Sequence, residues 1–320
     1  MIIFNFITMN KSSGSYYIGI DSGGTKCELV ISYPDKKIIF QKKYKGIHYS
    51  VAGAEIYSET VSGFITDAAA KCRLDLKHCQ GICFGIAGAR EKKDRNSLRK
   101  LFSQKLEVKN IIITSDAMTA LFGAFGGDEG IILISGTGSV LYGYTDNKII
   151  RVGGWGRIFA DEGSGYWIGK RALNLVTKEY DEMNDRKKPG ILSGSLFKNF
   201  GITKKNLNEK IFRSNFLIQN IAPLVIECAG KNCPLSKKIV DETVEALIEH
   251  IRSFLRISGR KKKIKIAFIG SIIENRNLIS DKLNKEIEKL KKVEVVTKEH
   301  PPAFGAVLLA MENSDLPSKL

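Results

Sequence analysis

The sequence predicts an α/β protein built from two similar halves, because one strand–turn–strand pattern occurs twice in its 320 residues. Each copy places a turn of small residues between two apolar strands, as a hairpin requires. The turns are Ser22–Lys26 (SGGTK) and Ser135–Ser139 (SGTGS). A third strand follows each turn, DKKII from Asp35 in the first copy and DNKII from Asp146 in the second. We therefore expect each half to begin with the same three-stranded meander.

Strands and helices alternate after each meander, as judged from hydrophobic periodicity. In the first half we expect helices at 54–73, 92–105 and 117–125 and buried strands at 81–88 and 110–114. In the second half we expect a helix at 164–180, a polar break at 181–190, a mainly helical stretch at 190–262, strands at 263–270 and 293–297, and helices at 277–291 and 303–311. This order predicts two duplicated ribonuclease-H-like domains with a cleft between them.

The expected domain ranges follow from these elements. Residues 1–15 are read as a disordered leader, because the first strand begins only at Tyr16, and Met9 is a second candidate start. The N-terminal domain then comprises residues 16–117 and 303–320. The C-terminal domain comprises residues 118–302, with a helical insertion at about 190–262.

The composition is that of a globular protein with a basic surface. Apolar residues make up 43% of the chain, enough for two cores, and the net charge is +16. The lysines are scattered in short groups, without an aromatic platform or a recognised nucleic-acid-binding motif, so we expect no nucleic-acid partner. The positive charge instead favours anionic substrates such as ATP by electrostatic steering.

The cysteines and the apolar runs indicate an intracellular protein. The six cysteines show no CxxC pair and no histidine at zinc spacing, so we read them as reduced packing residues. No run approaches the ~20 apolar residues of a membrane helix, and the apolar start lacks the pattern of a secretory signal. We expect a cytoplasmic protein with no membrane partner, and a homodimer stays open.

Both small-residue turns are suited to binding an anion. Glycines let a phosphate approach the backbone N–H groups, and the threonine and serine hydroxyls add donors. An ordinary hairpin turn is the alternative for either turn alone. Two such turns facing each other across a cleft would hold a nucleotide's phosphates from both sides.

Several motifs together resemble the BadF/BadG/BcrA/BcrD-type ATPase family, and within it the N-acetylglucosamine kinases. They are DSGGTK from Asp21, SDA from Ser115, SGTGS from Ser135, and GGWGRIFADEGSGYWIGKRAL from Gly153, with PPAFGA from Pro301. The similarity extends from Tyr16 to Met311, and the GGWG…DEGSGYWIG block is its most specific part. The wider superfamily contains actin, hexokinase and the heat-shock chaperone ATPases.

The resemblance implies an ATP-dependent sugar kinase that phosphorylates N-acetylglucosamine, or a related amino sugar, at its 6-hydroxyl, with Mg²⁺ as the metal. An ATPase that activates a CoA-ester reductase or dehydratase is the alternative, because the family includes such redox-partner proteins. Those use cysteines around an iron–sulfur cluster, which the scattered cysteines here disfavour. A non-catalytic sugar sensor is a further alternative.

Phosphoryl transfer needs a base and charge neutralisation, and this assigns the nucleotide and catalytic residues. Asp116, at a strand end and the expected N-cap of a helix, is the candidate base, and Asp21 is the candidate Mg²⁺ ligand through water. A plain helix cap is the alternative for Asp116, and turn formation for Asp21. Contacts to the nucleotide are expected from Ser22, Gly23, Gly24, Thr25, Lys26, Gly136, Thr137, Gly138, Gly270, Ser271 and Gly305.

By resemblance, Thr137, Trp155 and Asp161 belong to the sugar pocket, and Glu162 joins them. Interdomain packing is the alternative for Trp155, and capping of the following helix for the two acids. His48 stands where family kinases commonly carry a sugar-binding Asn, so the identity of the sugar depends on it. A surface loop position is the alternative for His48.

Overall fold

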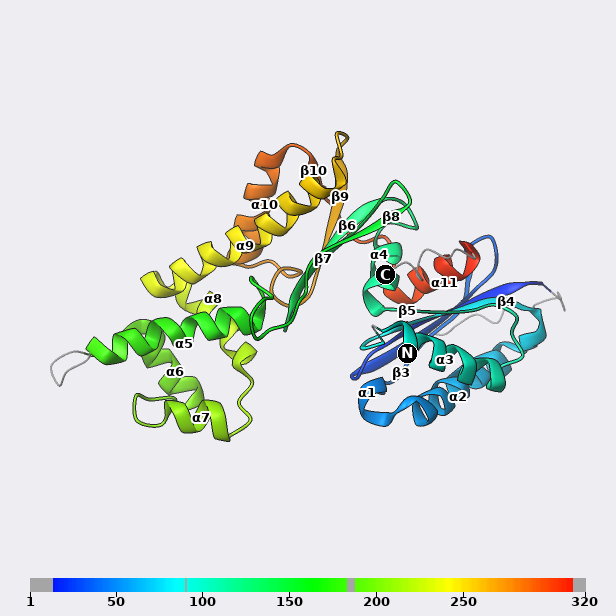
Figure 1. Cartoon of the computed structure of the whole chain (residues 1–320), viewed down its shortest axis with the longest axis horizontal. Helices are drawn as coiled ribbons and strands as arrows, with labels where there is room; N and C mark the ends of the chain where they lie inside the picture. Colours follow the sequence, from blue (N-terminus) through cyan, green and yellow to red (C-terminus); the bar gives the residue numbers. More distant parts are fainter. Residues whose placement is uncertain (1–13, 90, 183–187, 313–320) are drawn as a thin grey trace, which may run out of the picture. The chain divides into compact units, whose positions relative to one another are not determined.

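The structure is a computed structural model that describes residues 14–89, 91–182 and 188–312 (Figure 1). Its described residues form two compact units, the first up to Asp128 and again from Lys298, the second Glu129–Thr297. The expected leader at 1–15 lies outside the described residues except for residues 14 and 15. The predicted division after residue 117 falls inside a helix that the structure assigns whole to the first unit, as described next.

The first unit is built on a five-stranded mixed sheet with the order β3-β2-β1-β4-β5. The first three strands are an antiparallel meander, and β4 and β5 run parallel to β1. The strands are β1 Tyr16–Ser22, β2 Lys26–Ser32, β3 Ile38–Lys45, β4 Cys79–Ile86 and β5 Ile111–Thr114. The helices are α1 Tyr49–Ala52, α2 Ala54–Cys72, α3 Lys92–Lys105, α4 Asp116–Ala124 and α11 Pro302–Glu312, with a 3₁₀ turn, η1, at Leu76–His78.

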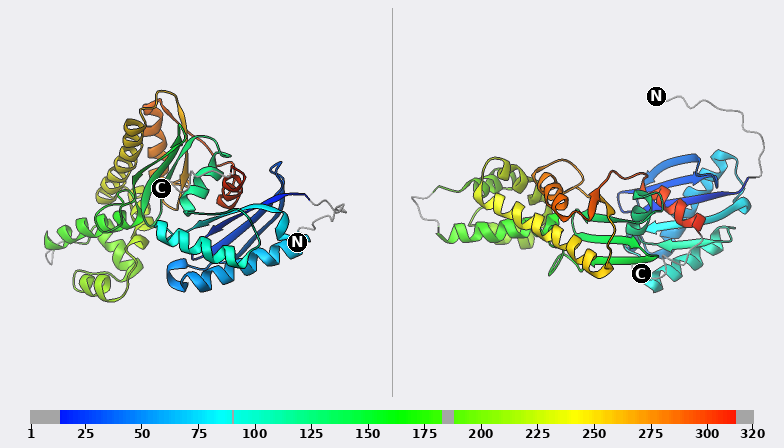
Figure 2. Two further views of the ribbon diagram at one scale, coloured as in Figure 1. Left: turned by 45° about the vertical axis from the view of Figure 1, so that its right-hand side comes forward. Right: turned by 90° about the horizontal axis from the view of Figure 1, so that it is seen from above.

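The alternation of side chains in β1 explains why helices cover both faces of this sheet. Ile18 and Ile20 are fully buried in one core cluster with residues of α2 and α3. Gly19 points the other way, where α11 packs so closely that a Cβ at Gly19 would lie 2.1 Å from the Ala303 carbonyl oxygen. Figures 1 and 2 show α2 and α3 on one face and α11 with α4 on the other. Because α4 packs against α11 here, it belongs to the first unit.

The second unit repeats this plan with the sheet order β10-β9-β6-β7-β8. Again a meander (β6, β7, β8) is followed by parallel strands, with β9 beside β6. The strands are β6 Gly130–Ser135, β7 Ser139–Thr145, β8 Lys148–Gly153, β9 Ile264–Ile269 and β10 Val293–Val295. The helices are α5 Gly165–Glu182, α6 Ile191–Phe200, α7 Leu207–Arg213, α8 Ala222–Gly230, α9 Pro234–Ser258 and α10 Leu278–Leu290, with a 3₁₀ turn, η2, at Ile218–Ile221.

The core of the second unit joins its sheet to the inserted helices. Ile131, Leu133 and Leu141 of β6 and β7 form one buried cluster with residues of α5, α8, α9 and α10. The two mixed sheets with the same strand order confirm the predicted α/β class and the duplication. No helix in the described part of the chain is both long and apolar enough to span a membrane.

Candidate functional site

Two aspartates lie at the same edge of the first sheet. Asp21 is the next-to-last residue of β1, and Asp116 opens α4 directly after Ser115, which follows β5. The strands β1, β4 and β5 are parallel neighbours, so their carboxyl ends meet at one edge, where open α/β sheets bind ligands. Thr119, one turn into α4, lies between the Asp21 side chain and the Asp116 backbone. Its hydroxyl lies 2.9 Å from the Asp116 carbonyl oxygen and 3.5 Å from Asp21 Oδ1.

Electrostatics make this edge favourable for a cation. Burial, followed by the negative charge of Asp116, raises the pKa of Asp21 to about 7, although Lys26 opposes the shift. A cation placed between the carboxylates would relieve both the desolvation and the repulsion. Mg²⁺ is bound by one or two carboxylates together with substrate phosphates, so this pair fits such an ion.

The N-cap prediction for Asp116 is wrong. Ser115 is the N-cap, because its carbonyl accepts the first helical bonds from the N–H groups of Met118 (3.1 Å) and Thr119 (3.4 Å). Asp116 is the first helical residue, and its Oδ1 accepts a local bond from the Ala117 N–H (3.0 Å). Asp116 is exposed. Its carboxylate is therefore not used to cap the helix and can meet a substrate hydroxyl.

The first predicted phosphate turn is present between β1 and β2. Gly24, Thr25 and Lys26 are exposed, and the Gly23 N–H donates to the Lys26 carbonyl at 2.9 Å. Ser22 differs from these residues because its side chain is buried beneath the turn, and its carbonyl accepts from the Ala87 N–H at 2.9 Å. We therefore place Ser22 as support for the turn rather than at its surface.

Two residues surround this turn. Gly46 lies against its back, since a Cβ there would be 2.4 Å from the Lys26 nitrogen. His48 lies beside it, because a Cβ at Gly24 would be 3.1 Å from His48 Cδ2. The His48 ring is exposed, with Nδ1 2.9 Å from the Ser50 hydroxyl. The structure thus brings His48 next to the predicted nucleotide turn.

The second predicted phosphate turn, at Gly136–Gly138, is fixed by the start of α5. The N–H groups of Gly165 and Tyr166 donate to the carbonyls of Gly136 (2.7 Å) and Thr137 (3.3 Å). Thr137 itself is exposed. Gly270 packs on the strand before the turn, because a Cβ at this position, with φ of 101°, would lie 2.4 Å from the Ser135 carbonyl oxygen. The exposed Ser271 follows it.

Asp161 connects the second turn to the loop between β8 and α5. Its Oδ1 accepts from the Gly156 N–H at 3.0 Å, and its Oδ2 would lie 2.7 Å from a Cβ at Gly138. Asp161 is buried with a positive φ of 59°. Neither Asp161 nor Glu162 caps α5, because the Ser164 hydroxyl accepts from the Trp167 N–H at 3.1 Å. The carboxylate of Asp161 therefore shapes the loop at the turn.

Three other predicted positions have distinct surroundings. Trp155 is 71% exposed, and the Arg151 guanidinium lies 5.0 Å from the centre of one of its rings. Glu162 is exposed. Gly305, expected to contact the nucleotide, lies in α11 on the side that faces α4, where a Cβ would be 2.0 Å from the Thr119 carbonyl oxygen. Helix packing explains why this position is a glycine.

The sequence reasoning missed Thr119 and Gly46. Thr119 is fully buried and stands three residues after Asp116, a helical spacing that places both on one face. That spacing was the available signal for Thr119. Gly46 had no local signal, since its role depends on a turn twenty residues earlier in the chain.

The six cysteines are free, and only Cys72 is partly exposed. Burial raises the pKa of the Cys27 thiol to about 11 and that of Cys79 to about 12. Such thiols remain protonated at neutral pH and are poor metal ligands. They behave as the packing residues that the sequence predicts.

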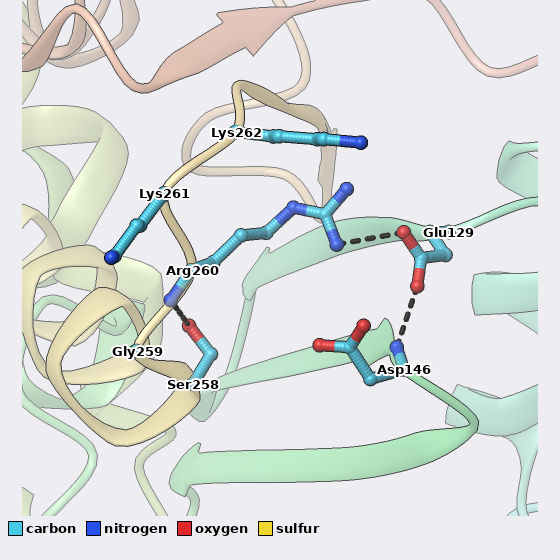
Figure 3. Close-up of a pocket in the computed structure, with 7 residues that line it drawn as sticks. All are labelled: Glu129, Asp146, Ser258, Gly259, Arg260, Lys261 and Lys262. Atoms are coloured by element: carbon cyan, nitrogen blue, oxygen red, sulfur yellow. Dashed lines mark hydrogen bonds and ion pairs between the residues drawn. The ribbon is translucent and has the colours of Figure 1, made fainter.

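One hollow, of about 310 Å³, lies at the other end of the second sheet (Figure 3). At this hollow, Glu129 bridges two segments: the loop after α9 that contains Arg260, Lys261 and Lys262, and the turn between β7 and β8. Its carboxylate accepts from Arg260 Nη1 at 2.7 Å and from the Asp146 N–H at 2.5 Å. None of the predicted site residues lines this hollow.

Comparison with known proteins decides the family. Residues 18–310 match the profile of the BadF/BadG/BcrA/BcrD ATPase family, which covers nearly the whole chain. The chain belongs to this family. Membership of an ATPase family implies ATP binding, and the predicted recognition is confirmed.

Two curated relatives span the same length as this chain. N-acetylmuramic acid/N-acetylglucosamine kinase of Clostridium acetobutylicum is 31% identical over 307 residues, which cover 94% of this chain and 99% of that protein. N-acetyl-D-glucosamine kinase of Dictyostelium discoideum is 27% identical over 319 residues, with 94% and 99% covered.

Solved structures share the fold. A protein of Chromobacterium violaceum, provisionally assigned as an N-acetylglucosamine kinase, has a TM-score of 0.69 at 23% identity, with 93% of this chain and 99% of that chain covered. A ROK family glucokinase of Streptomyces griseus, solved with glucose and AMPPNP, has a TM-score of 0.53 at 15% identity, with 93% and 100% covered. The duplicated actin-like ATPase fold that the sequence predicted is confirmed.

Proposed function

We propose that this protein is an ATP-dependent sugar kinase that phosphorylates the 6-hydroxyl of N-acetylglucosamine or a related amino sugar. The observation that carries the proposal is the pair Asp21 and Asp116 at one sheet edge, next to the exposed turn at Gly24–Lys26. The two curated relatives, both kinases of N-acetylated amino sugars, support it because they align over 94% of the chain.

The residues divide the work of phosphoryl transfer between them. The exposed carboxylate of Asp116 accepts the proton of the attacking sugar hydroxyl. Lys26 and the backbone N–H groups of its small-residue turn, Ser22–Lys26, hold phosphate oxygens. Asp21 would hold Mg²⁺ through water, and the ion would supply charge neutralisation of the phosphates when bound. The Thr119 hydroxyl keeps the first turn of α4 beside Asp21.

A coupled assay of ADP release tests this function. ATP turnover should require a sugar and should be greatest with N-acetylglucosamine or a related amino sugar within a panel that includes glucosamine, glucose and N-acetylmuramic acid. The activator alternative makes the opposite prediction, because it hydrolyses ATP without sugar and carries an iron–sulfur cluster. Sugar-independent turnover in a coloured protein would reject the kinase.

One observation favours N-acetylmuramic acid as a second candidate substrate. Arg157 lies in the loop between Trp155 and Asp161, is exposed, and has its guanidinium 5.4 Å from the centre of the Tyr166 ring. N-acetylmuramic acid carries a lactyl carboxylate that N-acetylglucosamine lacks, and a planar guanidinium is the side chain best suited to a carboxylate. The Clostridium relative is named for both sugars.

We expect Arg157→Gln to lower kcat/KM for N-acetylmuramic acid by about 10- to 100-fold, the value of a charge-assisted hydrogen bond. The value for N-acetylglucosamine should change less than about twofold, since it lacks the carboxylate. Arg157→Lys is the matched variant, because it keeps the charge and loses the fork of donors. Equal losses on both sugars in steady-state assays would show that Arg157 does not read the carboxylate.

His48→Asn tests the departure from the family pattern. Asn offers an acceptor and two donors, whereas neutral His offers one of each, so the variant should gain a hydrogen bond to the sugar. We expect kcat/KM for N-acetylglucosamine relative to glucosamine and glucose to shift by about 5- to 100-fold. Ser50→Ala is the control, because it removes the partner of the ring and leaves the ring in place. An unchanged preference on all three sugars would make His48 a loop residue only.

A further inference from the structure

One helix, α9, contacts three glycines that are spaced ten residues apart in the second unit. A Cβ at Gly143 in β7 would lie 2.1 Å from the Phe254 ring, and one at Gly153 would lie 2.3 Å from His250 Nε2. A Cβ at Gly163 would lie 2.7 Å from Leu247. The three α9 side chains follow the helical spacing of one face. The helix (yellow in Figure 1) therefore touches the sheet and both ends of one loop.

That loop carries the residues assigned to the sugar pocket. Gly153 ends β8 and Gly163 precedes α5, and both have a positive φ, 74° and 81°. The segment 154–162 between them includes Trp155, Asp161 and Glu162. A third contact fixes the helix that follows, because Arg171 of α5 makes two bonds to the Glu242 carboxylate of α9, at 2.7 and 2.8 Å.

His250 is a polar residue on the buried face of α9, as are Ser236 and Thr243. Its neighbours on this face are Val244, Leu247, Ile251 and Phe254, all buried. His250 is only 8% exposed, and its Nδ1 lies 2.8 Å from the Ala246 carbonyl oxygen. Because a carbonyl only accepts, Nδ1–H is the donor, and the bond fixes the orientation of the ring. The opposite edge, with Nε2, faces Gly153.

We propose that α9 is the support that holds the loop 154–162 in its binding conformation, with His250 as the positioning residue. This rests on the proposed function, in which the loop binds the sugar. The flat ring, fixed by its bond to Ala246, fits beneath Gly153, where even a Cβ on the glycine has no room. A replacement for His250 that cannot bond to the Ala246 carbonyl either leaves a void beneath Gly153 or fills that space in a variable orientation. The loop then opens more often, since local opening follows the loss of local contacts.

His250→Ala and Phe254→Leu are the test and its control. Both remove buried side-chain atoms from the same face of α9, but only His250 touches the loop. Limited trypsin digestion, followed by mass spectrometry of cleavage after the exposed Arg157, measures loop opening without substrate. We expect at least a tenfold rise for His250→Ala and less than a twofold change for Phe254→Leu. His250→Asn should restore most of the protection, because its amide can donate to Ala246.

Steady-state kinetics supply the second readout. We expect the KM for the sugar to rise at least tenfold in His250→Ala, and by a larger factor than the KM for ATP, which the loop reaches only through Asp161 at the Gly138 turn. Phe254→Leu should lower the Tm and leave both KM values in place. Unchanged cleavage in His250→Ala, or increased cleavage with an unchanged sugar KM, would overturn the proposal. If the wild-type protein phosphorylates no sugar, the proposed function fails, and cleavage after Arg157 still decides whether His250 holds the loop.

Discussion

The Asp116→Asn enzyme is expected to turn over about 10²- to 10⁴-fold more slowly than the wild type, the range for loss of a general base. Asn has nearly the same shape as Asp but accepts a proton poorly. The fold should survive, because Ser115 rather than Asp116 is the N-cap of α4, and within the described residues the Asp116 carboxylate makes a local bond to the Ala117 N–H. Single-turnover measurements with saturating ATP and sugar would isolate the chemical step.

Binding separates this effect from a structural one. The dissociation constants of a non-hydrolysable ATP analogue and of the sugar should stay within about threefold, since the carboxylate acts on the transferring proton. Asp281→Asn is the control, because Asp281 also lies in the first turn of a helix, α10. If Asp116→Asn kept more than about a third of the wild-type rate with chemistry limiting, the base would lie elsewhere.

Local patterns explain how much of the fold was predictable. The turns at Ser22–Lys26 and Ser135–Ser139 are encoded within ten residues each, and the structure places a hairpin at both. The helix at 92–105 was predicted with the bounds it has in the structure, because its charged and apolar residues alternate with a clear helical period. Each of these features depends only on neighbours in the sequence.

Features that depend on distant contacts were not predictable. The N-terminal unit was expected to end after residue 117, but α4 belongs to it because Gly305 and Gly123 let α11 pack closely against α4. The same contact gives a packing reason for the glycine at position 305, while its predicted nucleotide contact stays a prediction. A glycine pattern in the sequence does not say whether a ligand or a second helix approaches the backbone.

Asp21 illustrates how a site residue can cost stability. In the metal-free protein its pKa is about 7, raised from 3.8 by burial and by the charge of Asp116. Between these two pH values the folded state holds a proton that the unfolded chain releases. Stability therefore falls as pH rises through this window, and the full penalty is present above pH 7.

We therefore expect Asp21→Asn to inactivate the enzyme and to stabilise the metal-free protein. Turnover should fall by at least about 10²-fold, because the variant loses the carboxylate proposed to hold Mg²⁺. At pH 8 with EDTA, the variant should gain about 4 kcal/mol of unfolding free energy in denaturant titrations, given 1.36 kcal/mol for each of the roughly three pKa units.

The gain in unfolding free energy of Asp21→Asn over the wild type should shrink as the pH is lowered from 7 toward 4, where wild-type Asp21 is protonated in the folded protein. Mg²⁺ should narrow this difference in unfolding free energy at pH 8 by stabilising the wild type alone, because a ligand that binds only the folded state raises its stability.

Thr119→Ser keeps both acids and the hydroxyl, and so serves as a control that should show neither the loss of turnover nor the gain in stability. An Asp21→Asn protein that is less stable than the wild type at pH 8 without metal would show that the Asp21 carboxylate is already satisfied by the protein. The cation would then have to bind elsewhere, because an acid whose charge is already compensated has little to gain from Mg²⁺.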